Sequence, residues 1–334
     1  MSPSKGKLIL TIAVVTIAIG VWFLTRPTGP LEPVTIGVTR WVTNEEYDKN
    51  ISAFKEALAA AGFIEGKNIT YIIENPELDA EKQKQIIRSF VEKQVDLIYS
   101  LTTPGTLIAK ELAPKIPIVF SVVTYPVEAG VIASLHNSQN NLVGTRNWVD
   151  IEDQLAAFRE VAPEVKVIGF VHRQGEPNST IQYHEFKAAA ADAGIEVIEI
   201  TPATVEGLQA ALDEVKGRVD ALYSACDTLV QGGGEEIVIV FAKTSKLPDF
   251  TCNKSGVLKG SLVGTVADFS QIGKLAGEKA AKILRGTSPA SLETNTVARP
   301  FIYINQKTAD DLGITIPPDL FIRAKEVIYK DEIL

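Results

Sequence analysis

The sequence predicts an α/β protein with two βαβ lobes that meet across a cleft. From Val34 onward, short runs of β-branched residues alternate with amphipathic stretches of helical length, which is typical of right-handed βαβ units around a mainly parallel sheet. Residues 54–62 (FKEALAAAG) recur as 186–194 (FKAAAADAG), and residues 95–100 (VDLIYS) recur as 219–224 (VDALYS). Helix-to-strand junctions resemble one another in many α/β proteins, but two repeats in the same order favour two similar lobes.

The elements follow from the hydrophobic period and the helix breakers. A strand at 34–38 leads into a helix over 45–61, which places Ile51, Phe54 and Leu58 on one face and ends before Gly62. The first half continues with strands at 68–73, 96–99 and 116–120 and helices at 80–93 and 105–113. In the second half we expect strands at 165–171, 195–200 and 220–223.

The chain is long enough for two cores, with 334 residues and 46% apolar residues. We expect residues 1–33 to form an N-terminal segment and linker. Residues 34–146 plus 269–334 should form lobe 1, and residues 147–268 should form lobe 2. A net charge of −8 and the lack of a long basic run argue against a nucleic-acid partner. Two cysteines and three histidines offer little material for a metal centre, so we expect neither a metal nor a cofactor.

Residues 8–24 (LILTIAVVTIAIGVWFL) form an uncharged and mostly apolar stretch. As a hydrophobic helix this stretch is just long enough to cross a bilayer, and Lys5 and Lys7 before it favour an N-terminus inside. We expect an uncleaved signal anchor; a cleaved signal peptide and a buried helix of the globular part are the alternatives. Either signal places residues 34–334 outside the cytoplasm, attached to the cell membrane or, after cleavage, secreted or periplasmic.

Two strand ends predict a ligand site, because open α/β sheets bind ligands at the carboxyl ends of their strands, beside helix N-termini. The loop after Ser100 carries hydroxyls and N–H donors that suit a carboxylate. The loop after Ser224 carries Asp227, which suits an ammonium group. An amino acid would satisfy both loops, although threonine and aspartate are equally common as helix caps.

Catalytic signatures are missing from the sequence, which contains neither a Gly-x-Ser-x-Gly elbow nor a phosphate-binding glycine loop nor a His-Glu-x-x-His motif. The glycines at 232–234 precede Glu235 and Glu236, so we interpret them as a flexible helix start rather than an anion cradle. Cys226 and Cys252 each follow a predicted strand. A disulfide between them is one interpretation, and the one we favour is two separate apolar residues in the wall of the cleft.

Several motifs resemble those of the extracytoplasmic substrate-binding proteins of ABC importers, of the tryptophan-binding (TrpX-like) type. They are residues 62–68 (GFIEGKN), 102–105 (TTPG), 123–130 (VTYPVEAG), 141–145 (NLVGT), 177–179 (PNS), 226–228 (CDT), 266–269 (VADF) and 312–318 (LGITIPP). The resemblance implies a type I periplasmic-binding-protein-like fold, with two Rossmann-like lobes joined by three crossovers. It also implies a small solute as ligand, with a permease and an ATPase as partners. One departure is Tyr125, where the family commonly has aspartate.

Characterised members of the resembling family bind aromatic or branched amino acids, which agrees with the carboxylate and ammonium sites expected above. We expect Thr103 and Thr106 to hold the carboxylate, Asp227 to pair with the amine, and Trp41 to provide apolar cover. The full set of candidate ligand residues is Trp41, Thr102, Thr103, Gly105, Thr106, Thr124, Tyr125, His172, Asn178, Ser179, Asp227, Thr228, Asn253 and Asp268. A ligand-sensing subunit that docks on a membrane signalling partner is the alternative function, and an extracytoplasmic enzyme is disfavoured.

Overall fold

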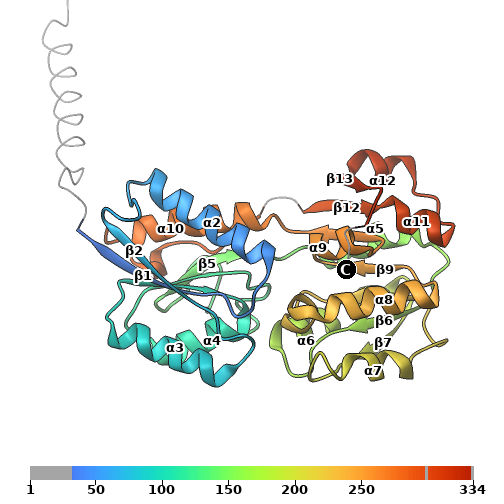
Figure 1. The fold of residues 1–334 in the computed structure, drawn as a ribbon, viewed down its shortest axis with the longest axis horizontal. Coiled ribbons are helices and arrows are strands. Elements are labelled where there is room, and N and C mark those ends of the chain that lie inside the picture. Colours follow the sequence, from blue (N-terminus) through green and yellow to red (C-terminus); the bar gives the residue numbers. More distant parts are fainter. Residues whose placement is uncertain (1–31, 298–299, 332–334) are drawn as a thin grey trace, which may run out of the picture. The chain divides into compact units, whose positions relative to one another are not determined.

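The first lobe, which contains β1, β2 and β5 in Figure 1, is built on a six-stranded sheet. The strand order is β11-β5-β4-β3-β1-β2, and every pairing is parallel. The structure is a computed structural model that describes residues 32–297 and 300–331. The strands are β1 (Val34–Thr39), β2 (Ile69–Glu74), β3 (Leu97–Leu101), β4 (Ile118–Ser121), β5 (Leu142–Arg146) and β11 (Asn295–Thr296). The helices are α2 (Glu45–Ala60), α3 (Ala80–Glu92), α4 (Thr103–Leu112) and α10 (Phe269–Ile283).

Helix α10 packs so closely on α2 that only glycine fits at the contact. A Cβ at Gly273 would lie 2.0 Å from the backbone oxygen of Asn50. The Asn50 side chain donates hydrogen bonds to Ser121 Oγ (2.9 Å) and to the Phe269 carbonyl oxygen (2.9 Å), and it accepts one from Tyr99. A returning helix from far along the chain is therefore part of the core of the first lobe.

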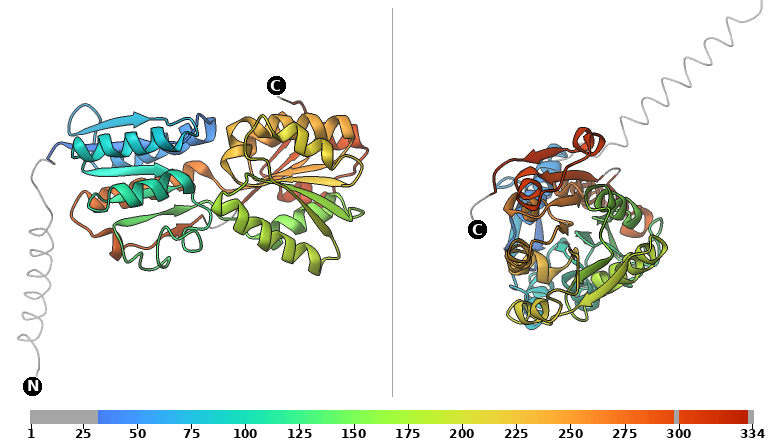
Figure 2. Two further views of the ribbon diagram at one scale, coloured as in Figure 1. Left: turned by 90° about the horizontal axis from the view of Figure 1, so that it is seen from below. Right: turned by 90° about the vertical axis from the view of Figure 1, so that its right-hand side faces the viewer.

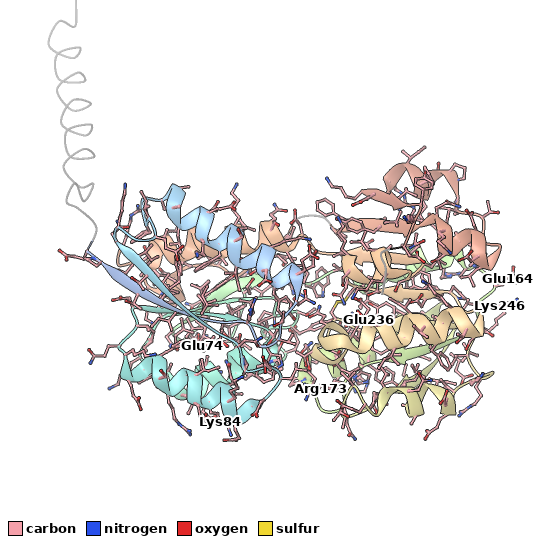
Figure 3. The ribbon with its side chains drawn as sticks, viewed as in Figure 1. Glu74, Lys84, Glu164, Arg173, Glu236 and Lys246 are labelled. Carbon is pink, nitrogen blue, oxygen red and sulfur yellow. A yellow bond between two sulfur atoms is a disulfide. The ribbon has the colours of Figure 1, made fainter. Side chains whose placement is uncertain are left out.

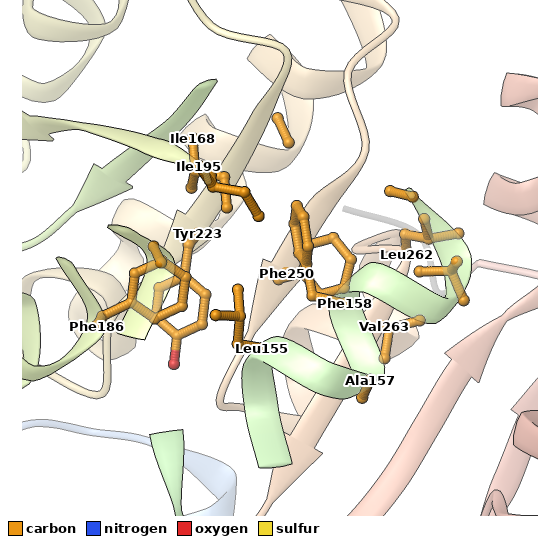
Figure 4. Close-up of a cluster of buried hydrophobic side chains, with 14 of the residues drawn as sticks. Leu155, Ala157, Phe158, Ile168, Phe186, Ile195, Tyr223, Phe250, Leu262 and Val263 are labelled. Atoms are coloured by element: carbon orange, nitrogen blue, oxygen red, sulfur yellow. The ribbon is translucent and has the colours of Figure 1, made fainter. Parts of the chain in front are cut away.

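The second lobe is built on a seven-stranded sheet in the order β13-β12-β10-β9-β8-β6-β7. Its strands are β6 (Val167–Val171), β7 (Glu196–Ile200), β8 (Ala221–Ser224), β9 (Asp249–Thr251), β10 (Val263–Val266), β12 (Phe301–Asn305) and β13 (Glu326–Ile328). Its helices are α5 (Ile151–Val161), α6 (Pro177–Asp192), α7 (Leu208–Glu214), α8 (Glu235–Ser245), α9 (Lys254–Lys259), α11 (Gln306–Leu312) and α12 (Pro318–Arg323). Aromatic rings fill its core: Phe158 and Phe250 have centroids 3.7 Å apart, and Phe186 and Tyr223 lie 4.5 Å apart (Figure 4).

Three connections join the lobes: β5 to α5, β10 to α10, and β11 to β12. The α/β class, the two lobes and the three crossovers are therefore confirmed. The expected division of the chain was wrong for the C-terminal part, because residues 301–328 belong to the second sheet. Strand β12 pairs antiparallel with β10, and β13 pairs parallel with β12, so this part of the chain lies on the second lobe (Figure 2).

The glycine-rich segment before α8 forms a kinked helical turn (Val230–Gly234), in which Gly233 has a φ of 115°. A positive φ of this size suits glycine alone, so the turn can bend into α8 only with glycine at this position. This agrees with the interpretation of a helix start. The expected hydrophobic helix at 8–24 lies outside the described residues. Within residues 32–297 and 300–331, no helix is long and apolar enough to cross a membrane.

Candidate ligand-binding site

The two lobes contact each other through segments that follow the carboxyl ends of their strands. The first interlobe contact centres on Gln231, which follows β8. Its side-chain oxygen accepts a hydrogen bond from Tyr47, and its backbone oxygen accepts one from Asn44 Nδ2 (3.2 Å). Gln231 Nε2 in turn donates to Asn253 Oδ1 (2.8 Å), and Asn253 Nδ2 donates to Glu235 Oε1 (3.1 Å). The tips of β8 and β9 are thus connected to the start of α2 in the other lobe.

The second interlobe contact joins the loop after β4 to helix α6. The hydroxyl of Tyr125 donates to Glu185 Oε2 (2.7 Å), and the tyrosine side chain is buried. The neighbouring Thr124 donates from Oγ1 to Asn147 Oδ1 (3.1 Å), at the first crossover. Both residues were predicted to touch a ligand; in the structure their hydroxyls bond to protein groups, and Tyr125 connects the lobes.

A cavity of about 400 Å³, open to solvent, lies between the lobes, since both contribute to its walls. The first lobe provides a mostly apolar wall of Trp41, Leu78, Ala80, Pro104, Leu107 and Ile108. The second lobe provides a polar wall that includes Arg173, Gln174 and Glu176, and Figure 3 shows Arg173 on the side of its lobe that faces the first. A ligand with a large apolar part and charged groups would match these two walls.

Buried polar atoms without a hydrogen-bond partner lie mainly at the strand ends and helix starts of both lobes, and one of them belongs to Trp41 in the cavity wall. Among the described residues they are Arg40 Nε, Trp41 Nε1, Thr102 Oγ1 and Thr103 Oγ1 in the first lobe, and His172 Nδ1 and Asn178 Oδ1 in the second; Thr145 Oγ1 on β5 is the seventh. Leaving such atoms unpaired costs about 1–3 kcal/mol each, so native structures rarely keep several together without a functional reason. Six residues, five of them candidate ligand residues and the sixth Arg40 beside Trp41, therefore each have a buried polar atom that is free to bond to a ligand.

The first-lobe tip also carries backbone strain. Trp41 and Thr102 have φ values of 69° and 71°, a region that side chains other than glycine rarely adopt and that marks functional sites when it recurs. Gly105 makes room for the indole, because a Cβ there would lie 3.3 Å from Trp41 Cε3. Thr106 instead donates from Oγ1 to Ser100 Oγ (3.0 Å), so it stabilises the loop inside the lobe.

Asp227 forms a helix cap at the tip of β8. Its Oδ1 accepts the backbone N–H groups of Leu229 (3.0 Å) and Val230 (2.9 Å), and its Oδ2 accepts that of Arg173. Burial raises the pKa of this carboxyl group, and the backbone donors from Val230 and Arg173 oppose the rise. The capping role that the sequence left open is thus present, and it uses three of the acceptor positions of the carboxylate.

Glu176, immediately before α6, was missed by the sequence analysis. Its carboxylate accepts from the Thr228 backbone N–H (3.2 Å) and from the Thr228 hydroxyl, and Arg173 donates from a guanidinium nitrogen to the same hydroxyl (2.9 Å). Burial and the nearby negative charge of Asp227 raise the pKa of Glu176 to about 8. A glutamate at a strand-to-helix junction of the second lobe was the only signal that could have indicated it.

Of the remaining candidate ligand residues, three lie at a strand end or helix start of the second lobe, and one, Asp268, lies elsewhere. Asn178 and Ser179 lie in the first turn of α6; Asn178 Nδ2 donates to the Cys226 carbonyl oxygen (2.9 Å), and Ser179 Oγ donates to that of Glu176 (3.4 Å). His172 directly follows β6, with its Nε2 2.9 Å from Glu199 Oε1. Asp268 lies apart from the cavity: it caps α10 by accepting from the Gln271 backbone N–H (3.0 Å), and it lines a groove between α2 and α10.

A disulfide joins Cys226 to Cys252, with 5.6 Å between their Cα atoms. The favoured interpretation of two separate wall residues was therefore wrong, and the alternative holds. The bond links the loop after β8 to the loop after β9. Because the first loop carries Asp227 and Thr228 and the second carries Asn253, the disulfide restrains the relative positions of the second-lobe candidates.

Comparison with known proteins supports a binding protein. The sequence model of the family "ABC transporter substrate binding protein" matches residues 35–328. The tyrosine-binding protein of Clostridioides difficile (strain R20291) is 30% identical over 279 residues, covering 84% of this chain and 81% of the relative.

Two solved structures are informative about the arrangement of the lobes. An ABC domain from Streptococcus pneumoniae in complex with L-tryptophan is 26% identical, covers 89% of this chain and 100% of its own, and has a TM-score of 0.86. A ligand-free, open substrate-binding protein with adhesive properties from Clostridium difficile is 29% identical with the same coverage, and has a TM-score of 0.69. By TM-score, the relative placement of the two lobes in this protein is more similar to that in the L-tryptophan complex than to that in the open structure. This agrees with the two interlobe contacts described above.

Proposed function

Because the chain belongs to the family of ABC transporter substrate-binding proteins, we propose that it is the extracytoplasmic receptor of an importer for an amino acid with an aromatic side chain. The relatives bind L-tryptophan and tyrosine. A receptor of this kind would deliver its ligand to a permease driven by an ATPase subunit. Residues 8–24 would hold it at the cell membrane, or would direct its secretion if they are cleaved.

The observation that carries this proposal is the group of unpaired buried polar atoms at the strand ends and helix starts, one of which belongs to Trp41 in the apolar wall of the cavity. Trp41 Nε1 and the hydroxyls of Thr102 and Thr103 are donors without partners, and a ligand carboxylate is an acceptor that can use several donors at once. Leu107 and Ile108 on α4 offer apolar surface in the same cavity, which suits an aromatic ring. Asn178 Oδ1, in the first turn of α6 on the other lobe, is an unpaired acceptor that an N–H group of the ligand would satisfy.

Closure of the lobes would couple binding to transport. A ligand that touches both walls stabilises the arrangement in which the walls approach, and three connecting segments allow a hinge motion. The interlobe hydrogen bonds of Tyr47 and Tyr125 would form together with ligand binding. A permease could then distinguish the loaded receptor from the empty one by the relative position of the lobes.

The proposal is tested by thermal unfolding of the full chain, refolded from denaturant to remove ligand carried through purification. L-tryptophan, L-tyrosine and L-leucine are compared with myo-inositol at the same concentration. A ligand at 100 times its Kd stabilises by about 2.7 kcal/mol, which raises Tm by several degrees. We expect a rise with the aromatic amino acids and none with myo-inositol. Lack of a rise with every amino acid would contradict the proposed function.

A further inference from the structure

We propose that Glu176, rather than Asp227, accepts the ammonium group of the ligand. The assignment rests on the proposed amino-acid receptor function and names the residue that would select for a primary amine. It follows from a comparison of the buried carboxylates on the second-lobe side of the cleft, of which three are described: Glu176, Asp227 and Glu235.

Two of these carboxylates are already occupied by protein donors. Asp227 accepts three backbone N–H groups, as described above. Glu235 accepts hydrogen bonds from Thr251 Oγ1 (3.0 Å), Asn253 Nδ2 (3.1 Å) and Ser255 Oγ (2.7 Å). Neither residue contributes to the wall of the interlobe cavity. Each has a structural role that accounts for its burial.

Glu176 differs in both respects. It lines the cavity, although its side chain is only 4% exposed, and Thr228 is the only residue that donates to it among those described. A carboxylate has about four acceptor positions, so Glu176 retains capacity on the side of the cavity. Its charge is also uncompensated at contact distance, because the Arg173 guanidinium reaches Thr228 rather than the carboxylate.

An independent observation points to a ligand at the same place. Trp41 lines this cavity from the opposite lobe, and its buried Nε1 has no partner among the described residues. A donor on one wall and a carboxylate on the other match the two charged groups of an amino acid, the carboxylate beside Trp41 and the ammonium beside Glu176. The ammonium would supply the positive charge that a pair of buried carboxylates, Glu176 and Asp227, otherwise lacks.

The test measures Kd by calorimetry for two ligands, L-tryptophan and 3-(indol-3-yl)propionate, which lacks the amine. Glu176→Gln keeps the shape of the side chain and removes the charge. We expect it to weaken L-tryptophan binding by about 30-fold or more and to leave the propionate equally or more tightly bound. The matched control is Asp249→Asn, since Asp249 is also buried but lies at the start of β9, away from the cleft. This control should change neither Kd by more than about threefold.

Each other outcome overturns the assignment. If Glu176→Gln binds L-tryptophan as the wild type does, or loses both ligands equally, Glu176 does not recognise the ammonium. If Asp227→Asn loses L-tryptophan but not the propionate, Asp227 holds that role. Failure of the wild type to bind any amino acid would instead refute the proposed function, and the assignment with it. Should Glu176→Gln fail to fold, as judged by its Tm, Glu176→Ala serves with the same expected ligand pattern.

Discussion

Tyr125 in the first lobe donates its hydroxyl to the Glu185 carboxylate in the second, with 2.7 Å between the tyrosine oxygen and Oε2. The tyrosine is 2% exposed, whereas Glu185 lies on the outer part of α6 and is exposed. The aspartate that the resembling family commonly has at this position would place a like charge toward Glu185. In this chain, tyrosine at position 125 instead provides a hydrogen bond between the lobes.

Tyr125→Phe keeps the ring and removes this interlobe hydrogen bond. A hydrogen bond of this kind contributes about 0.5–1.5 kcal/mol, so we expect the Kd for L-tryptophan to rise about 2- to 10-fold. The rise should come from faster dissociation, because the bond forms only once the lobes are together. Stopped-flow fluorescence measures both rate constants, and Tyr71→Phe on β2 is the matched control. A slower association with unchanged dissociation would contradict the role of Tyr125 in the closed arrangement.

Trp41→Phe separates the two roles of the indole. Phenylalanine keeps an aromatic ring over Gly105 but lacks the Nε1 donor, which is unpaired in the structure. We expect L-tryptophan binding to weaken by about 10- to 150-fold, as for loss of one hydrogen bond to a charged group. Trp41→Ala should weaken it further through loss of apolar contact. Calorimetry with tryptamine, which has no carboxylate, provides the check: its Kd should be the same for the wild type and Trp41→Phe.

Ligand affinity should depend on pH through Glu176, whose pKa is raised to about 8 by burial and by Asp227. Arg173 opposes this rise, and Tyr47 and Thr228 also face the carboxyl group. If the ionised carboxylate binds the ammonium, the affinity for L-tryptophan falls as the pH falls below about 8, by at most about tenfold per unit. Calorimetry between pH 6 and 9 measures the slope, and Glu176→Gln should remove it. A wild-type Kd that stays constant over this range would contradict the prediction.

The free energy of unfolding of the ligand-free protein should decrease as the pH rises, whereas the ligand affinity should increase. The pKa of Glu176 is higher in the folded protein, about 8, than in the unfolded chain, about 4.3. As the pH rises, the Glu176 carboxyl group therefore loses its proton at a lower pH in the unfolded chain than in the folded protein. The free energy of unfolding decreases between about pH 4.3 and 8. Glu176→Gln should be more stable than the wild type at pH 8 and should approach it at pH 4. Urea denaturation at the two pH values measures this difference, and a Glu176→Gln protein less stable at pH 8 would contradict it.

Reduction of the Cys226–Cys252 disulfide should destabilise the second lobe. The two residues are 26 apart in the sequence, and closing a loop of this size removes enough entropy from the unfolded chain to contribute about 3 kcal/mol. We expect dithiothreitol to lower the urea midpoint of the wild type. The double variant Cys226→Ser with Cys252→Ser should start at the lower midpoint and should not respond to dithiothreitol. A response of the double variant would show that reduction acts elsewhere.

Gly273→Ala tests the contact between α2 and α10. The added methyl group would lie 2.0 Å from the Asn50 backbone oxygen, so the helices must separate and the free energy of unfolding should fall by about 1–3 kcal/mol or more. Ser270→Ala, an exposed position on the same helix, is the control and should change it by less than about 0.5 kcal/mol. Equal stability of the two variants would contradict the close packing of the helices.

The sequence predicted those parts of the fold that local patterns determine. Strand β1 and helix α2 could be predicted because their hydrophobic periods and breakers are clear, and the repeats indicated two lobes. The placement of residues 301–328 could not be predicted, since an antiparallel strand that returns to β10 leaves no local signal. The carboxyl ends of the strands pointed to Thr102 and Asp227 as candidates, and the family resemblance added Asn178. The sequence alone could not separate a cap from a ligand contact, because both use the same side-chain oxygens.

Residue pairs that join the two lobes could not be predicted from local sequence patterns. Tyr125 and Glu185 are 60 residues apart, and nothing in either segment specifies the other. Glu176 precedes a proline at the start of α6 and resembles an ordinary solvated helix-start glutamate. Its burial depends on Thr228, 52 residues away. Such contacts arise from the packing of the two lobes rather than from a motif.

The return of β12 to the second sheet has a consequence for protein synthesis. Strand β10 is translated before α10 and β11, which belong to the other lobe, and β12 is translated only afterwards. During that interval one edge of β10 has no partner, although its residues are buried in the finished protein. Unpaired edges can join strands of other chains. The nascent chain therefore passes through a stage in which protection by a chaperone, or continuous export, would favour correct folding.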